Sequence, residues 1–320
     1  MHKPVLAVDI GGTNTKLALV GLEGNTGQVV SIPSSNEKGV DSFLADVASE
    51  ARSLLDSLAE DKALGVGIGV AGFVDPAHTM MTFNPNLEWL EGAPLKDYFS
   101  SRLDLPVFVE IDSNAAALAE ALHGGGKNSK RLLVLSIGTG VGGGMVIDGE
   151  VLRISNECLG DIGHVIVEPG GMQCSSGCRG CAEAMVSAPA LEKYAADFMA
   201  DDPSSLGYNR VQNGDAIRTP DIILAARQGD RAAVQAIQKI GYYLGIALAS
   251  MVPVFAPDQI SIAGGVSEAG ENFFKATETS FLKIAGSIYT EGVKLQKSTF
   301  GWQSVLIGAA AAQRRDAKLI

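Results

Sequence analysis

The chain alternates between short apolar runs and longer segments in which apolar side chains recur every three or four positions. The short runs, bounded by glycine or polar residues, predict buried strands at residues 5–10, 17–20, 28–33, 65–70, 107–111, 132–137, 144–147 and 260–263. The helical spacing predicts helices around residues 43–58, 113–122, 233–248 and 308–315. Strands and helices that alternate in this way predict an α/β fold.

Two of the predicted strand pairs repeat one pattern. Residues 6–20 and 134–147 each consist of an apolar run, a glycine-rich turn and a second apolar run, and Asp9 and Ser136 occupy the same place in the two units. Glycine lets a backbone come close to an anion, so that its N–H groups point at the charge. The repeat therefore predicts two phosphate-holding hairpins that face each other.

Asp9 lies beside the first of these turns. A carboxylate in that place suits a metal ion, or a metal-bound water, on a nucleotide phosphate. The alternative is a turn-forming aspartate that bonds its own backbone. The repeat and its carboxylate together predict that the chain binds ATP and moves or hydrolyses the terminal phosphoryl group.

Two other nucleotide-binding patterns fit less well. Gly138, Gly140 and Gly143 match G-x-G-x-x-G, but a dinucleotide site needs a helix directly after the loop. Here residues 145–149 predict a strand and a hairpin turn instead. The P-loop pattern G-x-x-x-x-G-K-[ST] does not occur in the sequence.

Asp112 is the best candidate for a catalytic base. It ends a predicted strand and precedes an alanine-rich helix, where we expect it to cap the helix N-terminus and to be stabilised in its charged form. A purely structural cap is the alternative. Phosphoryl transfer asks such a group only to orient the attacking hydroxyl and to accept its proton.

The chain has four cysteines, and three of them, Cys174, Cys178 and Cys181, lie within eight residues. His164 precedes this group by ten positions. The spacing C-x3-C-x2-C behind a histidine predicts zinc ligands, with incidental thiols as the alternative. A disulfide is disfavoured because we expect a cytosolic protein.

Composition limits the classes of function. At 320 residues two domains are expected, and 46% apolar residues are ample for their cores. A net charge of −11, with no basic tail, argues against a nucleic-acid surface. No apolar run approaches the ~20 residues of a membrane helix, and the first strand begins by Val5, so we expect no membrane span and no signal peptide.

Eight motifs extend over nearly the whole chain. They are D-I-G-G-T at 9–13, G-I-G-V-A-G-F-V-D at 67–75, N-P-N-L-E-W at 84–89, D-S-N-A-A-A-L-A-E at 112–120, G-T-G-V-G-G-G at 138–144, G-D-I-G-H at 160–164, C-S-S-G-C-R-G-C-A-E at 174–183 and A-G-G-V-S at 263–267. Together they resemble the ROK family (repressors, open reading frames and sugar kinases) of the actin-like ATPase superfamily. The set is highly specific, although each motif alone is weak.

The resemblance implies a two-lobed, actin-like (ribonuclease H-like) α/β fold with an interlobe cleft. A small lobe at residues 1–115, completed by a C-terminal helix at 303–320, would accompany a large lobe at 116–302 that carries the zinc segment. ATP and Mg²⁺ would lie in the cleft. The activity implied is transfer of the γ-phosphoryl group to a hydroxyl, usually the 6-hydroxyl, of a hexose or N-acylamino hexose. We also expect a cytoplasmic homo-oligomer, a dimer.

The resemblance also implies roles for individual residues. Asp112 matches the catalytic base. The nucleotide and its metal would be held by Asp9, Gly11, Gly12, Thr13, Gly138, Thr139, Gly140, Gly264 and Gly265. The sugar would be held by Asn86, Asp112, Asp161, His164 and Glu183. A structural Zn²⁺ would be held by His164, Cys174, Cys178 and Cys181.

Three positions depart from the family pattern. Ile111 stands where the family usually has an asparagine, and Asp161 stands where it has a glutamate. Ser176 replaces the usual second zinc cysteine, for which Cys178 is the expected substitute. The loss of an amide at Ile111 predicts that plain glucose is a poorer substrate here than for ordinary ROK glucokinases.

Two other functions compete with a sugar kinase. A ROK transcription regulator would carry a helix-turn-helix before the first strand, and only four residues precede Val5. A sugar-sensing protein with weak or no kinase activity is suggested by Ile111. Asp9, Asp112 and both glycine turns are present, which favours the kinase.

Overall fold

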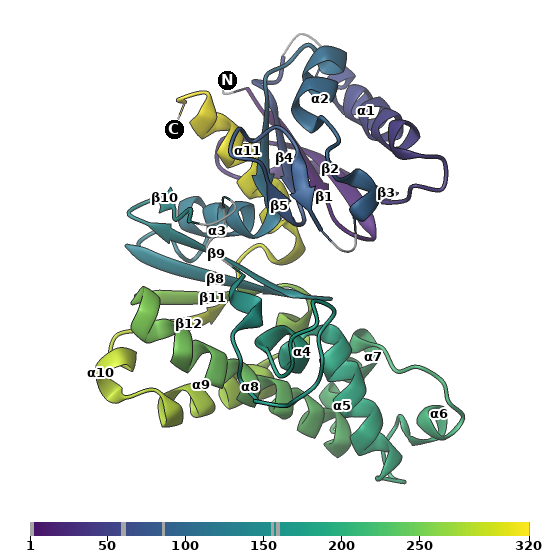
Figure 1. The fold of residues 1–320 in the computed structure, drawn as a ribbon, viewed down its shortest axis with the longest axis vertical. Helices are drawn as coiled ribbons and strands as arrows, with labels where there is room; N and C mark the ends of the chain where they lie inside the picture. Colours follow the sequence, from purple (N-terminus) through teal and green to yellow (C-terminus); the bar gives the residue numbers. More distant parts are fainter. Residues whose placement is uncertain (1–2, 59–61, 85–86, 155–156, 158–160, 320) are drawn as a thin grey trace. The chain divides into compact units, whose positions relative to one another are not determined.

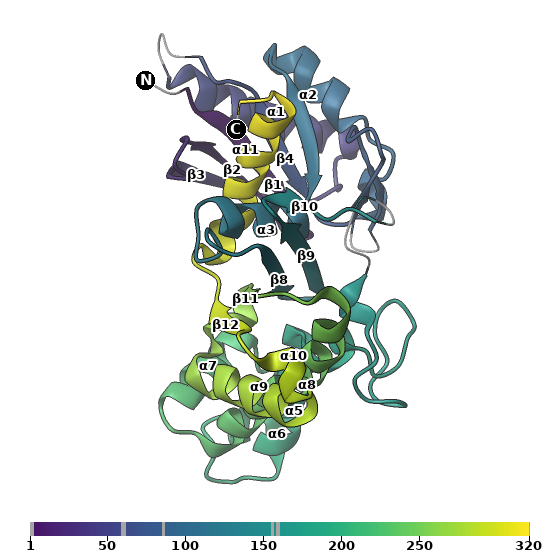
Figure 2. The same ribbon diagram turned by 90° about the vertical axis from the view of Figure 1, so that its left-hand side faces the viewer.

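The computed structural model describes residues 3–58, 62–84, 87–154, 157 and 161–319. Strands and helices alternate along the chain, as Figures 1 and 2 show, which confirms the α/β class. The strands are β1 Val5–Ile10, β2 Asn14–Val20, β3 Thr26–Pro33, β4 Val66–Val70, β5 Phe73–Val74, β6 Met81–Phe83, β7 Val107–Ile111, β8 Arg131–Ile137, β9 Val141–Ile147, β10 Glu150–Val151, β11 Gln259–Ala263 and β12 Lys294–Lys297.

The helices range from single turns to one of 25 residues. They are α1 Val40–Asp56, α2 Leu95–Leu103, α3 Asp112–Leu122, α4 Ala182–Val186, α5 Ala188–Ala200, α6 Tyr208–Gln212, α7 Thr219–Arg227, α8 Arg231–Phe255, α9 Glu271–Ile284, α10 Ser287–Thr290 and α11 Ser304–Asp316, with the 3-10 turns η1 Glu88–Leu90, η3 Ile162–His164, η4 Gly265–Ala269 and η5 Gly301–Gln303.

The chain divides into two compact units. The first contains Met1–Val134, Gly144–Gly160 and Trp302–Ile320, and the second contains Leu135–Gly143 and Asp161–Gly301. The C-terminal helix therefore belongs with the first unit.

The expected division after residue 115 stays a prediction. In the structure, β9 from Gly144 onward and the whole of α3 belong to the first unit. The reason is close packing: a Cβ on Gly308 of α11 would lie 1.6 Å from the carbonyl oxygen of Ala115 in α3.

The sheet of the first unit has the order β3-β2-β1-β4-β7. Strand β1 pairs antiparallel with β2, and β1, β4 and β7 run parallel. Parallel strands bring their carboxyl ends to one edge of a sheet. Asp9, near the end of β1, and Asp112, directly after β7, consequently lie at the same edge.

Strand β4 shows how sequence positions this sheet against its helices. Val66, Ile68 and Val70 belong to the apolar core that includes buried side chains of α1 and α2. The alternate glycines point the other way, because a Cβ on Gly67 would lie 2.0 Å from the carbonyl oxygen of Ala309, and one on Gly69 would lie 2.4 Å from Val305. Glycine at these positions lets α11 lie directly on the strand.

The second sheet has the order β10-β9-β8-β11-β12. Strands β8 and β9 are neighbours that flank the turn at residues 138–140, so the residues after G-x-G-x-x-G form a strand as predicted. In the second unit α8 packs against α9 and α5 (Figure 1). Gly241 and Gly245 of α8 provide the close approach to α9.

Helix α8 is long and apolar enough to match a membrane span by length and composition. More than half of its most apolar window, 56%, is buried inside the protein, as expected of the core helix of a globular unit. The match is therefore weak support for a span.

Candidate active site

Asp9 is buried near the end of β1, with 7% of the residue exposed. Its cross-strand partner in the hairpin is Lys16, whose Nζ lies 3.4 Å from Asp9 Oδ2. Burial raises the pKa of Asp9 above its ordinary value, and the charge and hydrogen bond of Lys16 partly offset that rise. Gly11, Gly12 and Thr13 form the turn beside it, and Gly12 and Thr13 are exposed.

Lys16 was not among the residues predicted from sequence. A signal was present, however, because a tight hairpin that pairs residue 10 with residue 15 across the four residues 11–14 must pair residue 9 with residue 16. Its ammonium is a third charged group at this edge of the sheet.

Asp112 is the first residue of α3, and Ile111 holds the N-cap position. The expected capping role is therefore wrong by one residue; Asp112 Oδ1 accepts a hydrogen bond from the next backbone N–H, of Ser113, at 2.6 Å. Desolvation, followed by repulsion from the Asp9 carboxylate, raises the pKa of Asp112 to about 7, against the smaller effect of the Ser113 hydrogen bond. The helix terminus thus does not keep this carboxyl acidic, because loss of water and a like charge outweigh it.

A buried polar network holds the strand that leads to Asp112. Glu110 is fully buried, and Arg153 Nη2 lies 2.5 Å from Glu110 Oε2 while Nη1 lies 3.1 Å from Oε1. Asn114 Nδ2 donates to Glu110 Oε1 at 3.1 Å and to the carbonyl oxygen of Glu157 at 2.9 Å. Charge-assisted, bidentate pairing of this kind restrains the β7–α3 junction from both sides. Sequence reasoning missed these residues, because no local pattern relates Glu110 to Arg153.

The second glycine turn joins β8 to β9. Space over the Cα atoms of Gly138 and Gly265 is open, since a Cβ on either would meet nothing within 4 Å. Gly264, at φ 87°, packs against the backbone of Ile137 at the end of β8. The structure thus brings the turn at 138–140 and the glycine pair 264–265 together, with Thr139 exposed, and leaves backbone accessible to a phosphate.

Glu183, expected to bind sugar, contacts this same turn. Its Oε2 accepts the backbone N–H of Val141 at 3.1 Å, and Ser175 Oγ lies 3.4 Å from its Oε1. The carboxylate therefore connects the cysteine-bearing segment to the second hairpin.

The four predicted zinc ligands converge in the second unit. The ligand atoms of His164, Cys174, Cys178 and Cys181 all lie within 4.8 Å of one another. Cys174 Sγ lies 3.2 Å from Cys178 Sγ, and His164 Nδ1 lies 3.7 Å and 3.5 Å from these two sulfurs. Three sulfurs and one imidazole nitrogen at this spacing fit a closed tetrahedral site.

The clustered thiols also affect one another's acidity. Burial, reinforced by the neighbouring sulfurs, raises the pKa of the Cys178 thiol to about 12. A bound cation lowers the pKa of its thiol ligands, so a metal would stabilise a set of thiolates that otherwise repel one another.

The other nitrogen of His164 faces Asp161, which is predicted to bind sugar, and Ser176. His164 Nε2 lies 3.3 Å from Asp161 Oδ2 and 3.3 Å from Ser176 Oγ. Asp161 is half exposed, at 52% of its side chain. A metal on Nδ1 would fix the orientation of the ring, and hence of this exposed edge.

Two further positions from the sequence analysis concern the sugar. Asn86, which is predicted to bind it, lies outside the described residues. Ile111 is described, and its side chain is 3% exposed and belongs to the apolar core of the first unit.

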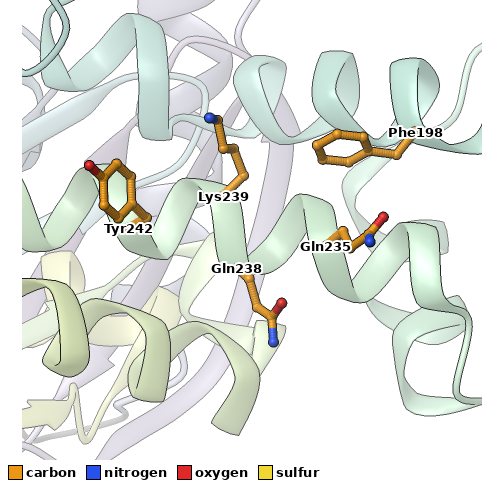
Figure 3. Close-up of a pocket in the computed structure, with 5 residues that line it drawn as sticks. All are labelled: Phe198, Gln235, Gln238, Lys239 and Tyr242. Atoms are coloured by element: carbon orange, nitrogen blue, oxygen red, sulfur yellow. The ribbon is translucent and has the colours of Figure 1, made fainter.

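A surface hollow of about 500 Å³ lies between α5 and α8 (Figure 3). Its lining consists of Phe198, Gln235, Gln238, Lys239 and Tyr242. The lining contains no carboxylate and none of the predicted site residues, so it takes no part in the chemistry above.

Comparison with known proteins consistently finds members of the ROK family. The profile of the ROK family matches residues 5–315. The glucokinase of Halalkalibacterium halodurans is 32% identical over 307 residues, which are 95% of this chain and 92% of that protein. The crystal structure of a ROK family glucokinase from Streptomyces griseus in complex with glucose and AMPPNP has a TM-score of 0.86 at 30% identity, with 98% of this chain and 99% of that chain covered.

A regulator is also similar. The structure of a ROK family transcriptional regulator, a homologue of the E. coli MLC protein, has a TM-score of 0.87 at 28% identity and covers 98% of this chain but 78% of its own. These likenesses confirm the actin-like α/β fold class predicted from the sequence.

Proposed function

The chain belongs to the ROK family, and we propose that it is an ATP-dependent sugar kinase of the hexokinase type. It transfers the γ-phosphoryl group to a hydroxyl, the 6-hydroxyl, of a hexose or N-acylamino hexose. The observation that carries this proposal is the pair Asp9 and Asp112 at one edge of the first sheet, with the pKa of Asp112 near 7. The likeness to two glucokinases, one of them bound to glucose and AMPPNP, supports it.

Asp112 acts as the general base. A base with a pKa near neutrality is largely ionised at pH 7.5 and still accepts a proton effectively. As the sugar oxygen bonds to phosphorus and ADP leaves, the hydroxyl proton passes to the Asp112 carboxylate. The Glu110–Arg153 pair positions the strand end that carries it.

Asp9 serves the phosphate side of the reaction. Its buried carboxylate would hold Mg²⁺, directly or through water, and the ion would neutralise charge on the nucleotide phosphates. The turn beside it, Gly11 to Thr13, offers backbone N–H groups. Lys16 places a positive charge beside Asp9, which partly offsets the rise in the pKa of Asp9 caused by burial.

The second unit contributes residues that bind the nucleotide and the sugar. Its glycine positions Gly138, Thr139, Gly140, Gly264 and Gly265 receive the nucleotide, supported by the open space over two of them. Sugar hydroxyls both donate and accept hydrogen bonds, which suits the exposed Asp161 carboxylate and His164 Nε2. Asn86 and Glu183 complete the proposed sugar contacts.

His164, Cys174, Cys178 and Cys181 would hold a structural Zn²⁺, because four protein ligands fill a tetrahedral site. We further infer a cytoplasmic homodimer that binds neither nucleic acid nor membrane. The net charge of −11 argues against a nucleic-acid surface.

The test is a coupled assay of ADP release over a panel of glucose, mannose, their N-acetylamino forms and deoxy sugars. We expect one or more of these sugars to raise ADP release well above the sugar-free rate. If AMPPNP binds but no sugar stimulates ADP release, the sugar-sensing alternative replaces the kinase.

A further inference from the structure

The turn between β8 and β9 is restrained by a carboxylate from a distant part of the chain. Glu183 Oε2 accepts the N–H of Val141, which follows the turn directly, at 3.1 Å. A Cβ on Gly140 would lie 2.7 Å from the same oxygen, so the carboxylate is packed against the turn as well as bonded to it. A glycine at position 140 makes room for this contact.

Glu183 is held in place by the cysteine segment. It lies in the first turn of α4, and the preceding cap residue, Cys181, is one of the four clustered ligands. Cys181 Sγ accepts the N–H of Ala184 at 3.5 Å. The position of the Glu183 backbone therefore depends on the residues that form the proposed zinc site.

Two further contacts connect the same turn to this segment. The N–H of Ala188 donates to the carbonyl oxygen of Gly138 at 2.8 Å. Gly163, next to His164, lies against Val141, because a Cβ on Gly163 would be 2.0 Å from the Val141 carbonyl oxygen. The turn is thus held at one end by the start of α5 and at the other by Gly163, the neighbour of His164.

We propose that Glu183 is a positioning residue for the nucleotide: its carboxylate holds the Gly138–Gly140 turn in the conformation that binds phosphate. This inference rests on the proposed ATP-dependent activity. The role is additional to the sugar contact proposed above, because a side chain that only bound sugar would affect sugar affinity and leave nucleotide affinity unchanged. Because Cys181 caps the helix that carries Glu183, the conformation of the second hairpin would also depend on the metal cluster.

The charge of Glu183 and its hydrogen-bond acceptor have opposite effects on nucleotide binding. A carboxylate near a phosphate-binding turn repels the anion, so its charge opposes nucleotide binding, whereas its acceptor oxygen supports it. A glutamine retains the acceptor and removes the charge. An alanine removes both.

The experiment measures binding of AMPPNP with Mg²⁺ by calorimetric titration without sugar, and KM for the sugar at saturating ATP. Glu183→Ala should weaken AMPPNP binding by about tenfold or more, the effect of losing a hydrogen bond to a charged acceptor. Glu183→Gln should remain within about threefold of the wild type. Ser175→Ala, which removes the contact to the other carboxylate oxygen, is the matched control and should have no effect.

Gly140→Ala provides an independent variant that leaves Glu183 in the chain. Its new methyl group would displace the carboxylate, so it should weaken AMPPNP binding as Glu183→Ala does, and the double variant should be no worse than either. Zinc content and the unfolding midpoint are recorded for each protein.

If Glu183→Ala and Gly140→Ala bind AMPPNP normally and only the KM for sugar rises in the former, the inference is overturned. A wild-type protein that does not bind AMPPNP would instead overturn the proposed function itself.

Discussion

The two glycine hairpins share a backbone pattern but obtain their charges differently. In the first, Asp9 and Lys16 are cross-strand neighbours within a few residues of the turn. In the second, Ser136 stands at the place of Asp9, and the carboxylate comes from Glu183, 42 residues beyond Val141. The first hairpin therefore carries its own charged groups, while the second depends on another segment.

This difference suggests that the two hairpins have different roles in phosphate binding. A buried carboxylate beside a turn suits a cation and the reacting phosphoryl group, and it also raises the pKa of Asp112 by repulsion. A turn of uncharged backbone, open over Gly138, suits phosphate oxygens without a metal. A duplicated motif thus supplies equivalent backbone, and the side chains around it decide the chemistry.

The largest effect should come from the base beside the first hairpin. Asp112→Asn should reduce turnover by about 10²-fold or more, because the variant cannot accept the hydroxyl proton. Binding of AMPPNP should change less than threefold. Asp97→Asn, an exposed aspartate on α2, is the control. Near-normal turnover in Asp112→Asn would remove Asp112 from the mechanism.

The pH dependence should separate the two hairpins. Asp112 must be ionised to act, so its raised pKa predicts that kcat/KM for the sugar falls about tenfold per pH unit below about 7. Asp9→Asn should move this midpoint to lower pH, since it removes the like charge. Ser136→Ala, the equivalent position in the second hairpin, should leave it unchanged. An acidic limb near pH 4 in the wild type would contradict the assignment.

Loss of the metal should affect the second hairpin and spare the first. Elemental analysis of protein purified without chelator should give one zinc per chain, and Cys178→Ser should lower that content. KM for ATP should then rise about five- to tenfold, as expected for loosened support of a binding loop. The pH midpoint should stay in place. Ser176→Ala, beside the cluster, should retain its zinc. Less than about half an equivalent in the wild type argues against the site.

The smallest effect concerns the sugar. Ile111→Asn should raise kcat/KM for glucose about fivefold, near the low end of the value of one hydrogen bond to a buried hydroxyl. The unfolding midpoint should fall, because Ile111 packs in the apolar core of the first unit. Ile111→Val is the control for packing alone. If glucose is already the best substrate and the variant gives no gain, Ile111 does not determine specificity.

Much of the molecule follows from local sequence. The apolar runs and glycine turns predicted both hairpins, and β1 and β7 begin and end at the predicted residues. The spacing of Cys174, Cys178 and Cys181 behind His164 predicted a cluster that the structure brings together. These features depend on strand period, turn chemistry and ligand spacing, which neighbouring residues encode.

Tertiary structure decided the rest. The pairing of Glu110 with Arg153, the contact of Glu183 with Val141 and the packing of α11 on α3 join residues that no local pattern relates. The pKa of Asp112 likewise depends on contacts between segments that are distant in sequence. Sequence placed a carboxyl at a helix start and so predicted an acidic group, but burial and the charge of Asp9 made it a base near neutrality. Desolvation and long-range pairing depend on which segments fold against one another, and that is determined only when the whole unit has formed.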